Sequence, residues 1–197
     1  MGTKRKIGVG VCGLAELLLT AGLPYDSPEG RQLAQEVLAF ITYTSKLASV
    51  ELAARRGPCP AIHTGIAIPP TGRSAPVIGA STGIEPLFRL TDPHQPGHLH
   101  PAAHSVLEQA GRSDLIEHVM THGRLPEDAG LPAPLASVLA TATQIAPSGH
   151  LAMAAAVQAC VDETVSKTVN LPATARAIDV YDTYLSAWEL ACKGITV

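Results

Sequence analysis

The sequence predicts an α/β chain in which helices predominate. Several stretches repeat apolar residues at helical spacing, and two short stretches have the pattern of strands. The first, at 65–68, is a short apolar run in a region rich in proline and glycine. The second, at 165–170, alternates between polar and apolar residues. Because 197 residues fit one domain, we expect a single domain spanning 1–197.

The first stretch resembles an export signal, since three basic residues at 4–6 precede an apolar run at 7–23. Glu16 interrupts that run, and its longest uncharged part is far shorter than the ~20 residues of a membrane span. We therefore expect a buried amphipathic helix in a cytoplasmic protein that contacts no membrane.

The same stretch contains the pattern G-x-G-x-x-G at Gly8, Gly10 and Gly13. A dinucleotide site needs a strand before this pattern, and only seven residues precede Gly8. Close packing of the chain through small residues explains the glycines equally well.

A long helix is predicted from Pro28 to Arg56. Ser27 is a typical N-cap, Pro28 suits the first helical position, and Gly57 can end the helix. Its predicted apolar face consists of Leu33, Val37, Phe40, Ile41, Leu47 and Leu52.

Composition excludes some classes of function. With 14 basic and 17 acidic residues the formal charge is -3, which argues against a nucleic-acid binder and against global disorder. The four cysteines are far apart and form no C-x-x-C pair, so we expect no metal site and four buried free thiols. His118 and His122 are four residues apart, but Val119 stands where a zinc enzyme needs glutamate, and surface histidines are expected.

Two loops and one polar strand face are candidates for a site. The apolar run 65–68 leads into a loop containing Pro70, Thr71, Gly72, Arg73 and Ser74, and a second loop follows at 81–86. In the alternating stretch, Ser166, Thr168 and Asn170 share one face. That face either lines a site or is a solvated edge. Further helices are expected from Pro147 and across 180–190.

Four strings, taken together, resemble one enzyme family. They are KIGVGVCGLA at 6–15, PTG at 70–72 with GIEPLF at 83–88, HL at 150–151 with SKTVNLP at 166–172, and AWEL at 187–190 running to KGITV at 193–197. This order of strings is similar to the C-terminal part of the adenosylcobalamin-dependent (class II) ribonucleotide reductases. Some members are split into two chains, and this one resembles the smaller, C-terminal subunit.

The resemblance implies a ten-stranded α/β barrel, of which this chain supplies the last strands with their helices. It implies an oxidoreductase in which adenosylcobalamin starts radical reduction of ribonucleotides to deoxyribonucleotides. It also implies that Pro70, Thr71, Gly72, Arg73 and Ser74 bind the substrate phosphates, as backbone N–H groups and a helix N-terminus can. An ordinary Pro/Gly turn is the competing interpretation.

Several positions differ from the family pattern. Arg73 replaces a hydroxyl residue, Ala75 replaces serine, and Arg176 and Ile178 stand where a threonine cap and an acid are usual. The family's Asn-x-Cys-x-Glu cluster is absent, since the single asparagine, Asn170, precedes Leu-Pro. We therefore expect no catalytic residue in this chain and a partner, an N-terminal reductase chain that carries the catalytic cysteines. A non-catalytic nucleotide-binding or regulatory remnant of the barrel is the alternative, and an unrelated helical module requires all four strings to be coincidence.

Overall fold

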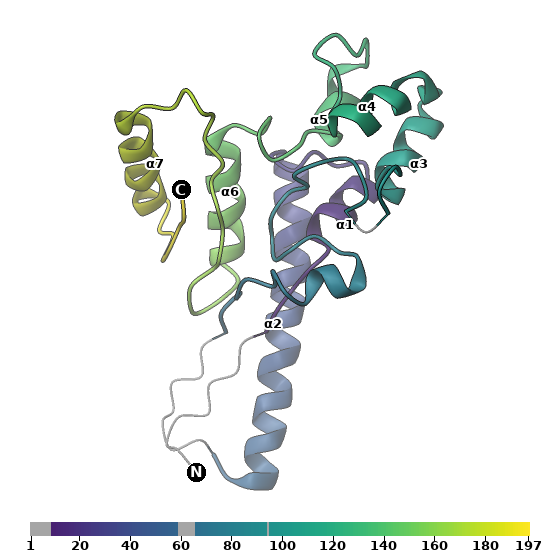
Figure 1. Ribbon diagram of the computed structural model, residues 1–197. Coiled ribbons are helices and arrows are strands. Elements are labelled where there is room, and N and C mark those ends of the chain that lie inside the picture. Colours follow the sequence, from purple (N-terminus) through teal and green to yellow (C-terminus); the bar gives the residue numbers. More distant parts are fainter. Residues whose placement is uncertain (1–8, 59–65, 94) are drawn as a thin grey trace.

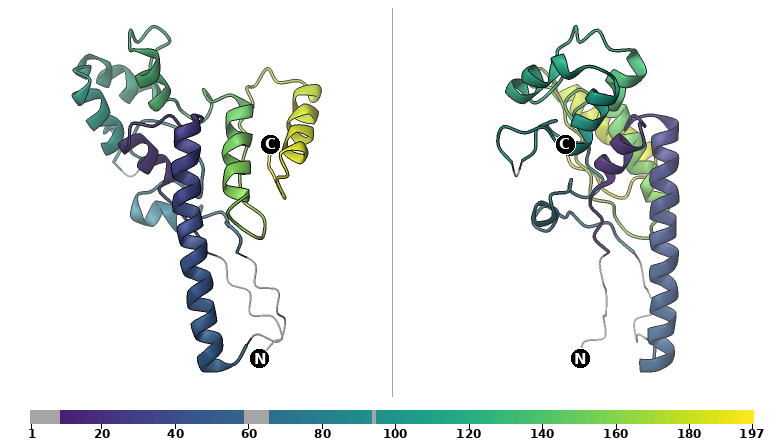
Figure 2. Two further views of the ribbon diagram at one scale, coloured as in Figure 1. Left: turned by 180° about the vertical axis from the view of Figure 1, so that it is seen from behind. Right: turned by 90° about the vertical axis from the view of Figure 1, so that its right-hand side faces the viewer.

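The computed structural model describes residues 9–58, 66–93 and 95–197 (Figure 1). Within this described part, the helices are α1 (Leu14–Thr20), α2 (Pro28–Arg56), α3 (Pro101–Gln109), α4 (Ile116–His122), α5 (Ala133–Val138), α6 (Pro147–Gln158) and α7 (Ala177–Glu189), with 3₁₀ turns η1 (Ala75–Ile78) and η2 (Ser113–Leu115). The first part of α2 lies beside α6, and the rest of α2 extends away from the other helices (Figures 1 and 2). Helix α7 lies on one side, and α3, α4 and α5 cluster on the other (Figures 1 and 2).

The predicted strands form short pairs and no extended ladder. In the described residues, extended segments meet only at isolated bridges. Ile68 with Val165 and Thr168 with Thr196 are parallel pairs, whereas Cys12 with Thr82 and Thr91 with Leu99 are antiparallel. The described fold is therefore helix-rich with a rudimentary parallel arrangement, and it does not show ten strands.

The bounds predicted for α2 are confirmed. The Ser27 hydroxyl accepts a hydrogen bond from Gly30 N at 2.9 Å, and Gly57 ends the helix with φ 77°. Close packing requires a glycine at position 30, because a Cβ there would lie 2.4 Å from the Pro24 carbonyl oxygen. The cap and this contact together fix where the helix begins.

The face predicted for α2 was right in its first half and wrong in its second. Leu33 and Val37 are half-buried and pack against the largest core cluster. The fully buried line of α2 is formed by residues at i, i+4 spacing, namely Gly30, Ala34, Leu38 and Thr42. Phe40 is 70% exposed, and Leu47 and Leu52 are also exposed. By length and composition α2 is apolar enough to cross a membrane, a test that core helices of soluble proteins also pass. Periodicity therefore predicted the packing side near the start of α2 but not the exposure of its later apolar residues.

Three clusters of buried side chains hold the helices together. The largest joins α1, α2 and α6 to the extended segments through residues such as Leu18, Leu38, Ile68, Met153 and Val165. A second surrounds α3 and α4, and a small third cluster of Leu151, Val169 and Ala187 connects α6 to α7. Helix α7 is thus attached to the rest of the protein by few apolar contacts.

The remaining predictions have mixed outcomes. Helices α6 and α7 lie where expected, and α1 buries four residues of the predicted amphipathic run. Gly10 packs against the Thr71 methyl group, and Gly13 is the left-handed N-cap of α1. Residues 1–8, including Gly8, and Cys59 lie outside the described residues.

Cysteines and histidines were also only partly predicted. The prediction of buried thiols was wrong for Cys12, which is exposed, while Cys160 and Cys192 are half-buried. The His118 and His122 rings stack at 4.1 Å on α4, at or near the surface as expected. In the described residues, no three potential ligands converge on a metal position.

Candidate functional site

The candidate site lies where two parallel segments end. Ser166 N donates to the Ile68 carbonyl at 2.9 Å, and Ile68 N donates to the Thr164 carbonyl at 3.2 Å. Since the two segments run in the same direction, the chain leaves both at the same edge. Loop 70–74 and residues 168–170 therefore emerge together. The carboxyl edge of parallel strands is the usual position of ligand sites in α/β proteins.

A third segment lengthens this edge. Val169 N donates to the Thr196 carbonyl at 2.8 Å, and Thr196 N donates to the Lys167 carbonyl at 3.0 Å. Segment 195–197 pairs with segment 167–169 on one side, and its other side has no backbone partner in the described residues. The arrangement thus has an open edge next to α7.

Within the predicted phosphate loop, Thr71 has an internal role. It is buried, its hydroxyl donates to the Val11 carbonyl at 3.1 Å, and it accepts from Gly83 N at 2.7 Å. Ser74 N and Ala75 N both donate to the Thr71 carbonyl, which closes the turn. Thr71 therefore joins the loop to the segment before α1 and to the loop at 81–86.

The other four loop residues, Pro70, Gly72, Arg73 and Ser74, are exposed. Gly72 has no left-handed φ, and a Cβ there would meet nothing within 4 Å, so the turn itself does not require glycine. In the described structure, the N–H groups of Gly72 and Arg73 donate to no backbone acceptor. The expected helix after the loop is the four-residue turn η1, whose dipole is small. Anion binding here would rest on loop N–H groups and the Arg73 guanidinium.

The polar face of the second segment is partly as predicted. Ser166, Thr168 and Asn170 are half-buried, while Val165 and Val169 on the opposite face are buried. Asn170 Oδ1 is buried and has no hydrogen-bond partner in the described residues.

Sequence analysis missed the most buried charged group, Lys167. Its side chain is 0% exposed, and Nζ lies 2.5 Å from Glu85 Oε2 and 3.0 Å from His150 Nδ1. Nζ also donates to the Thr168 carbonyl, and Glu85 Oε1 accepts from Thr168 N at 2.7 Å. A lysine between two buried valines in the alternating stretch was the signal that could have identified it.

The pKa values around Lys167 define the protonation states. Burial lowers the pKa of the Lys167 ammonium, although the Glu85 carboxylate opposes this shift. Burial and then the Lys167 charge lower the pKa of His150 to about 4. His150 is therefore neutral at pH 7: Nδ1 accepts from Lys167, and Nε2–H donates to the Ala142 carbonyl at 2.9 Å.

Tyr25 covers this cluster from the side of α2. Burial raises its pKa well above the ordinary value, and its hydroxyl donates to the Ile84 carbonyl at 2.6 Å. Its ring centroid lies 6.0 Å from Lys167 Nζ and 6.1 Å from the His150 ring. Together, Glu85, His150 and Lys167 fix the loop after η1 against the segment that carries Thr168. This arrangement positions the backbone on both sides of the ion pair.

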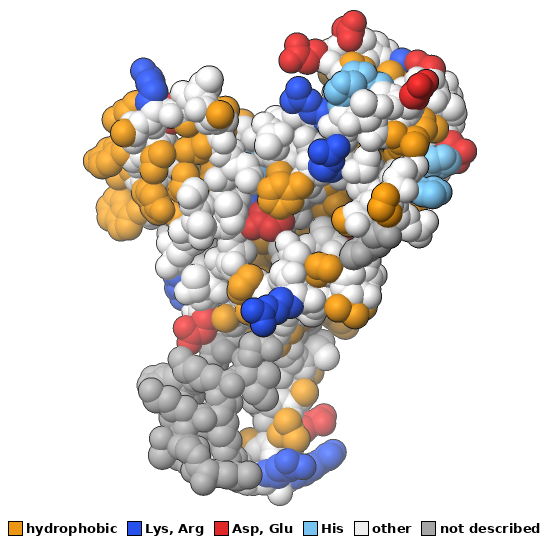
Figure 3. Space-filling model, in the orientation of Figure 1, with side chains coloured by type: hydrophobic (Ala, Val, Ile, Leu, Met, Phe, Trp, Pro, Cys, Tyr) orange, Lys and Arg blue, Asp and Glu red, His pale blue; other side chains and the backbone are white. Residues whose placement is uncertain are grey.

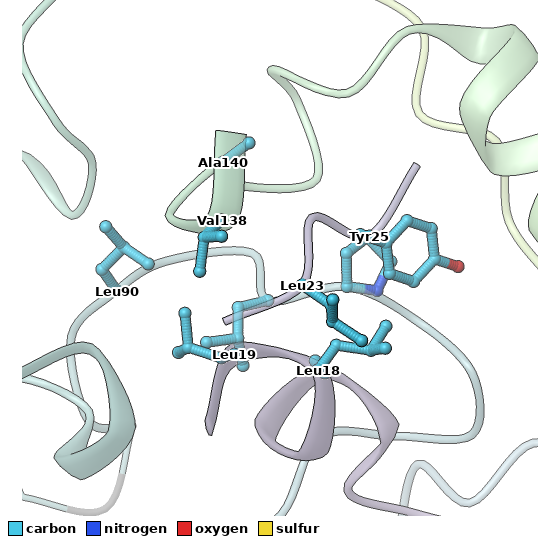
Figure 4. Close-up of a pocket in the computed structure, with 10 residues that line it drawn as sticks. Leu18, Leu19, Leu23, Tyr25, Leu90, Val138 and Ala140 are labelled. Atoms are coloured by element: carbon cyan, nitrogen blue, oxygen red, sulfur yellow. The ribbon is translucent and has the colours of Figure 1, made fainter. Parts of the chain in front are cut away.

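A small pocket lies beside this region (Figure 4). Its lining is apolar, with side chains that include Leu18, Leu19, Leu23 and Leu90, and it contains none of the predicted site residues. It has room for roughly one water molecule. A corrin ring does not fit it.

The helices and the parallel pairs at this edge define a helix-rich α/β class of protein. Comparisons with known proteins identify the family. The ribonucleotide reductase barrel-domain family model matches residues 1–65 and 62–197. The chain belongs to this family.

The relatives extend this result. The chain is 39% identical over 213 residues to the vitamin B12-dependent ribonucleoside-diphosphate reductase of Mycobacterium tuberculosis (strain CDC 1551 / Oshkosh), covering 98% of this chain and 31% of that protein. It is 32% identical to the protein of the same name from Thermoplasma acidophilum, covering 98% of this chain and 28% of that relative. The chain thus spans about a third of the length of these relatives.

A solved structure supports the fold. The Actinobacillus ureae class Id ribonucleotide reductase alpha subunit matches 98% of this chain and 38% of its own, with a TM-score of 0.85 and 24% identity. At this level of identity the likeness establishes the fold.

Proposed function

We propose that this chain forms the C-terminal part of the barrel of a vitamin B12-dependent ribonucleoside-diphosphate reductase and contributes the loop that binds the substrate phosphates. The observation that carries the proposal is the shared edge at which loop 70–74 and residues 168–170 emerge. The names of the relatives support the reaction class.

The loop offers two kinds of donor to a diphosphate. The N–H groups of Gly72 and Arg73 can approach an anion closely because no side chain covers residue 72. The Arg73 guanidinium can bind two phosphate oxygens at once. Ser166, Thr168 and Asn170 are proposed to line the adjacent part of the site.

In this proposal, catalysis uses residues outside this chain. We propose that an N-terminal reductase portion brings the catalytic cysteines and the adenosylcobalamin site, and that the assembled enzyme acts in the cytoplasm. The exposed apolar faces of α2 and α7 support an incomplete shell, since large exposed apolar surfaces mark interaction sites.

A chimera tests the proposal. This chain replaces the matching C-terminal region of the Mycobacterium tuberculosis relative, and ribonucleoside diphosphate reduction is measured with adenosylcobalamin. The proposal expects deoxynucleotide formation. A folded chimera without activity contradicts it, and a chimera that does not fold contradicts the claim that this chain completes such a barrel.

Loop variants test the phosphate role. In the chimera, Gly72→Val should weaken substrate binding without loss of stability, because the added side chain enters open space. Arg73→Gln should raise KM, while the matched exposed variant Arg124→Gln should leave it unchanged. Equal KM for all variants excludes the loop as a phosphate site.

The second candidate is a nucleotide-binding remnant without catalysis. Arg73 and Ala75 favour it, because they change the loop from the family pattern. Arg176 does not, since Asp179 caps α7 by accepting from Arg176 N at 2.7 Å. Nucleoside diphosphate binding by an inactive, folded chimera would favour this candidate.

A further inference from the structure

An ordinary surface helix buries its large apolar side chains, whereas helix α7 exposes them to solvent. It buries Thr183 and Ala187 and exposes larger apolar side chains. Tyr181 is 62% exposed, and Trp188 is 75% exposed. Ile178, Tyr181, Leu185 and Trp188 follow one another at spacings of three and four residues, so they form one continuous stripe.

Most aromatic side chains in the described part of the protein are exposed as well. The described protein has seven Phe, Tyr and Trp residues, and only Tyr25 is buried. Three of the exposed ones lie on α7, namely Tyr181, Tyr184 and Trp188. Tyr and Trp are among the residues that are enriched at the centres of protein interfaces. The space-filling view shows hydrophobic side chains gathered over α7 (Figure 3).

The charges on α7 indicate which charges a protein docked on this helix would carry around the contact. Between residues 177 and 189 there are three acidic residues and no Lys or Arg. Asp179 is paired with Arg176 at 3.4 Å, whereas Asp182 and Glu189 are exposed beside the stripe. A partner surface with an apolar centre and a basic rim is complementary to this arrangement.

The neighbouring segment points to the same partner. Segment 195–197 follows α7 and has an unpaired side in the described structure. A partner that adds a strand there would also reach α7. The chain spans about a third of the length of its relatives, so the portion that these relatives have in addition is large enough to cover both.

We propose that the stripe of Ile178, Tyr181, Leu185 and Trp188 is the docking surface for the remaining, N-terminal portion of the reductase barrel, which meets it with an apolar, basic-rimmed face. This inference rests on the proposed function. It assigns the contact to a particular helix face and gives the partner's chemistry.

Hydroxyl-radical footprinting with mass spectrometry tests the surface residue by residue. The free chain is compared with the chimera described above. Trp188 and Tyr181 should be oxidised rapidly in the free chain and severalfold more slowly in the chimera. Met120, exposed on α4 far from α7, is the internal control and should react equally in both (Figure 1).

Each outcome has a separate meaning. An active chimera in which Trp188 reacts as fast as in the free chain overturns this inference and leaves the proposed function standing. A folded but inactive chimera in which Trp188 is protected supports the docking surface and contradicts the proposed function. Protection that grows with the concentration of the free chain identifies a second copy as the occupant and overturns the inference.

A variant pair adds an independent readout. Tyr181→Ser combined with Trp188→Ser should lower chimera activity about tenfold or more, as expected for central interface anchors. Met120→Ser should leave activity unchanged. Unchanged activity in the double variant, with its fold verified by circular dichroism, also overturns the inference.

Discussion

Replacing Lys167 by methionine tests the physical role of the buried cluster. The side chain is fully buried, and methionine is of similar length, so the substitution removes the charge and leaves little cavity. The Glu85 carboxylate then loses its ammonium partner at 2.5 Å and keeps the Thr168 N–H at 2.7 Å. The neighbouring His150 Nδ1 loses its donor.

The expected cost follows from this geometry. Removing one member of a buried ion pair typically costs about 3–5 kcal/mol. Glu85 is 14% exposed and retains one hydrogen bond, so the lower figure applies, about 3 kcal/mol. Glu85→Gln leaves the ammonium wholly buried and should cost at least as much. The double variant Lys167→Met/Glu85→Gln should cost less than the two single costs together, because no unpaired charge remains.

The pH dependence supplies a second measurement. The pKa of His150 is about 4 in the folded protein, against an ordinary value of 6.5. Between these values the unfolded chain binds more protons, so this contribution to stability is full above pH 6.5 and falls as the pH drops towards 4. The loss amounts to about 3 kcal/mol at most. In Lys167→Met the pKa of His150 should rise, because one of the two causes of its depression is gone.

Urea unfolding at pH 7 and histidine-ring NMR titration measure the two effects. A Lys167→Met protein as stable as the original refutes the ion-pair argument. So does an unchanged titration of His150 in that variant. Additive costs in the double variant would show that the two charges act independently, contrary to the 2.5 Å contact.

Three further predictions concern the helices and thiols. Gly30→Ala should lower stability by about 2 kcal/mol in thermal unfolding, since its Cβ would lie 2.4 Å from the Pro24 carbonyl oxygen; a neutral effect contradicts that packing. Ser27→Ala should cost about 1 kcal/mol through loss of the N-cap bond, whereas Ser27→Asp should retain most of the stability. Iodoacetamide should label exposed Cys12 well before Cys160, whose thiol pKa is raised by burial, and equal labelling rates would contradict the described packing.

The sequence predicted those features that depend on neighbouring residues. The bounds of α2 follow from a Ser-Pro start and a glycine end, and both signals act within one helical turn. The start of α6 at Pro147 has the same local origin. The exposure of Phe40 on α2 depends on distant residues, which local signals do not contain.

The sequence pattern identified the polar residues of the candidate site but did not identify its buried charged residue, Lys167. The alternation at 165–170 assigned Ser166, Thr168 and Asn170 to one face, and the structure leaves that face half-buried. It also placed Lys167 among valines, but its partners, Glu85 and His150, are 82 and 17 residues away in sequence. Long-range pairs of this kind require the tertiary fold, and no local pattern contains them.

The position of that ion pair has a consequence for the site. The parallel segments pair at single bridges, so few backbone hydrogen bonds fix their register. A slip of one residue would turn Lys167 outward and bring Ser166 or Thr168 into the core, because side chains alternate along a strand. Such a slip would break the contact with Glu85 and leave a buried carboxylate with reduced pairing. The pair therefore selects one register, and that register sets where residues 168–170 emerge beside loop 70–74. Lys167→Met should consequently alter substrate KM in the chimera even under conditions where the variant remains folded, and a KM unchanged by this substitution would limit the pair to a role in stability.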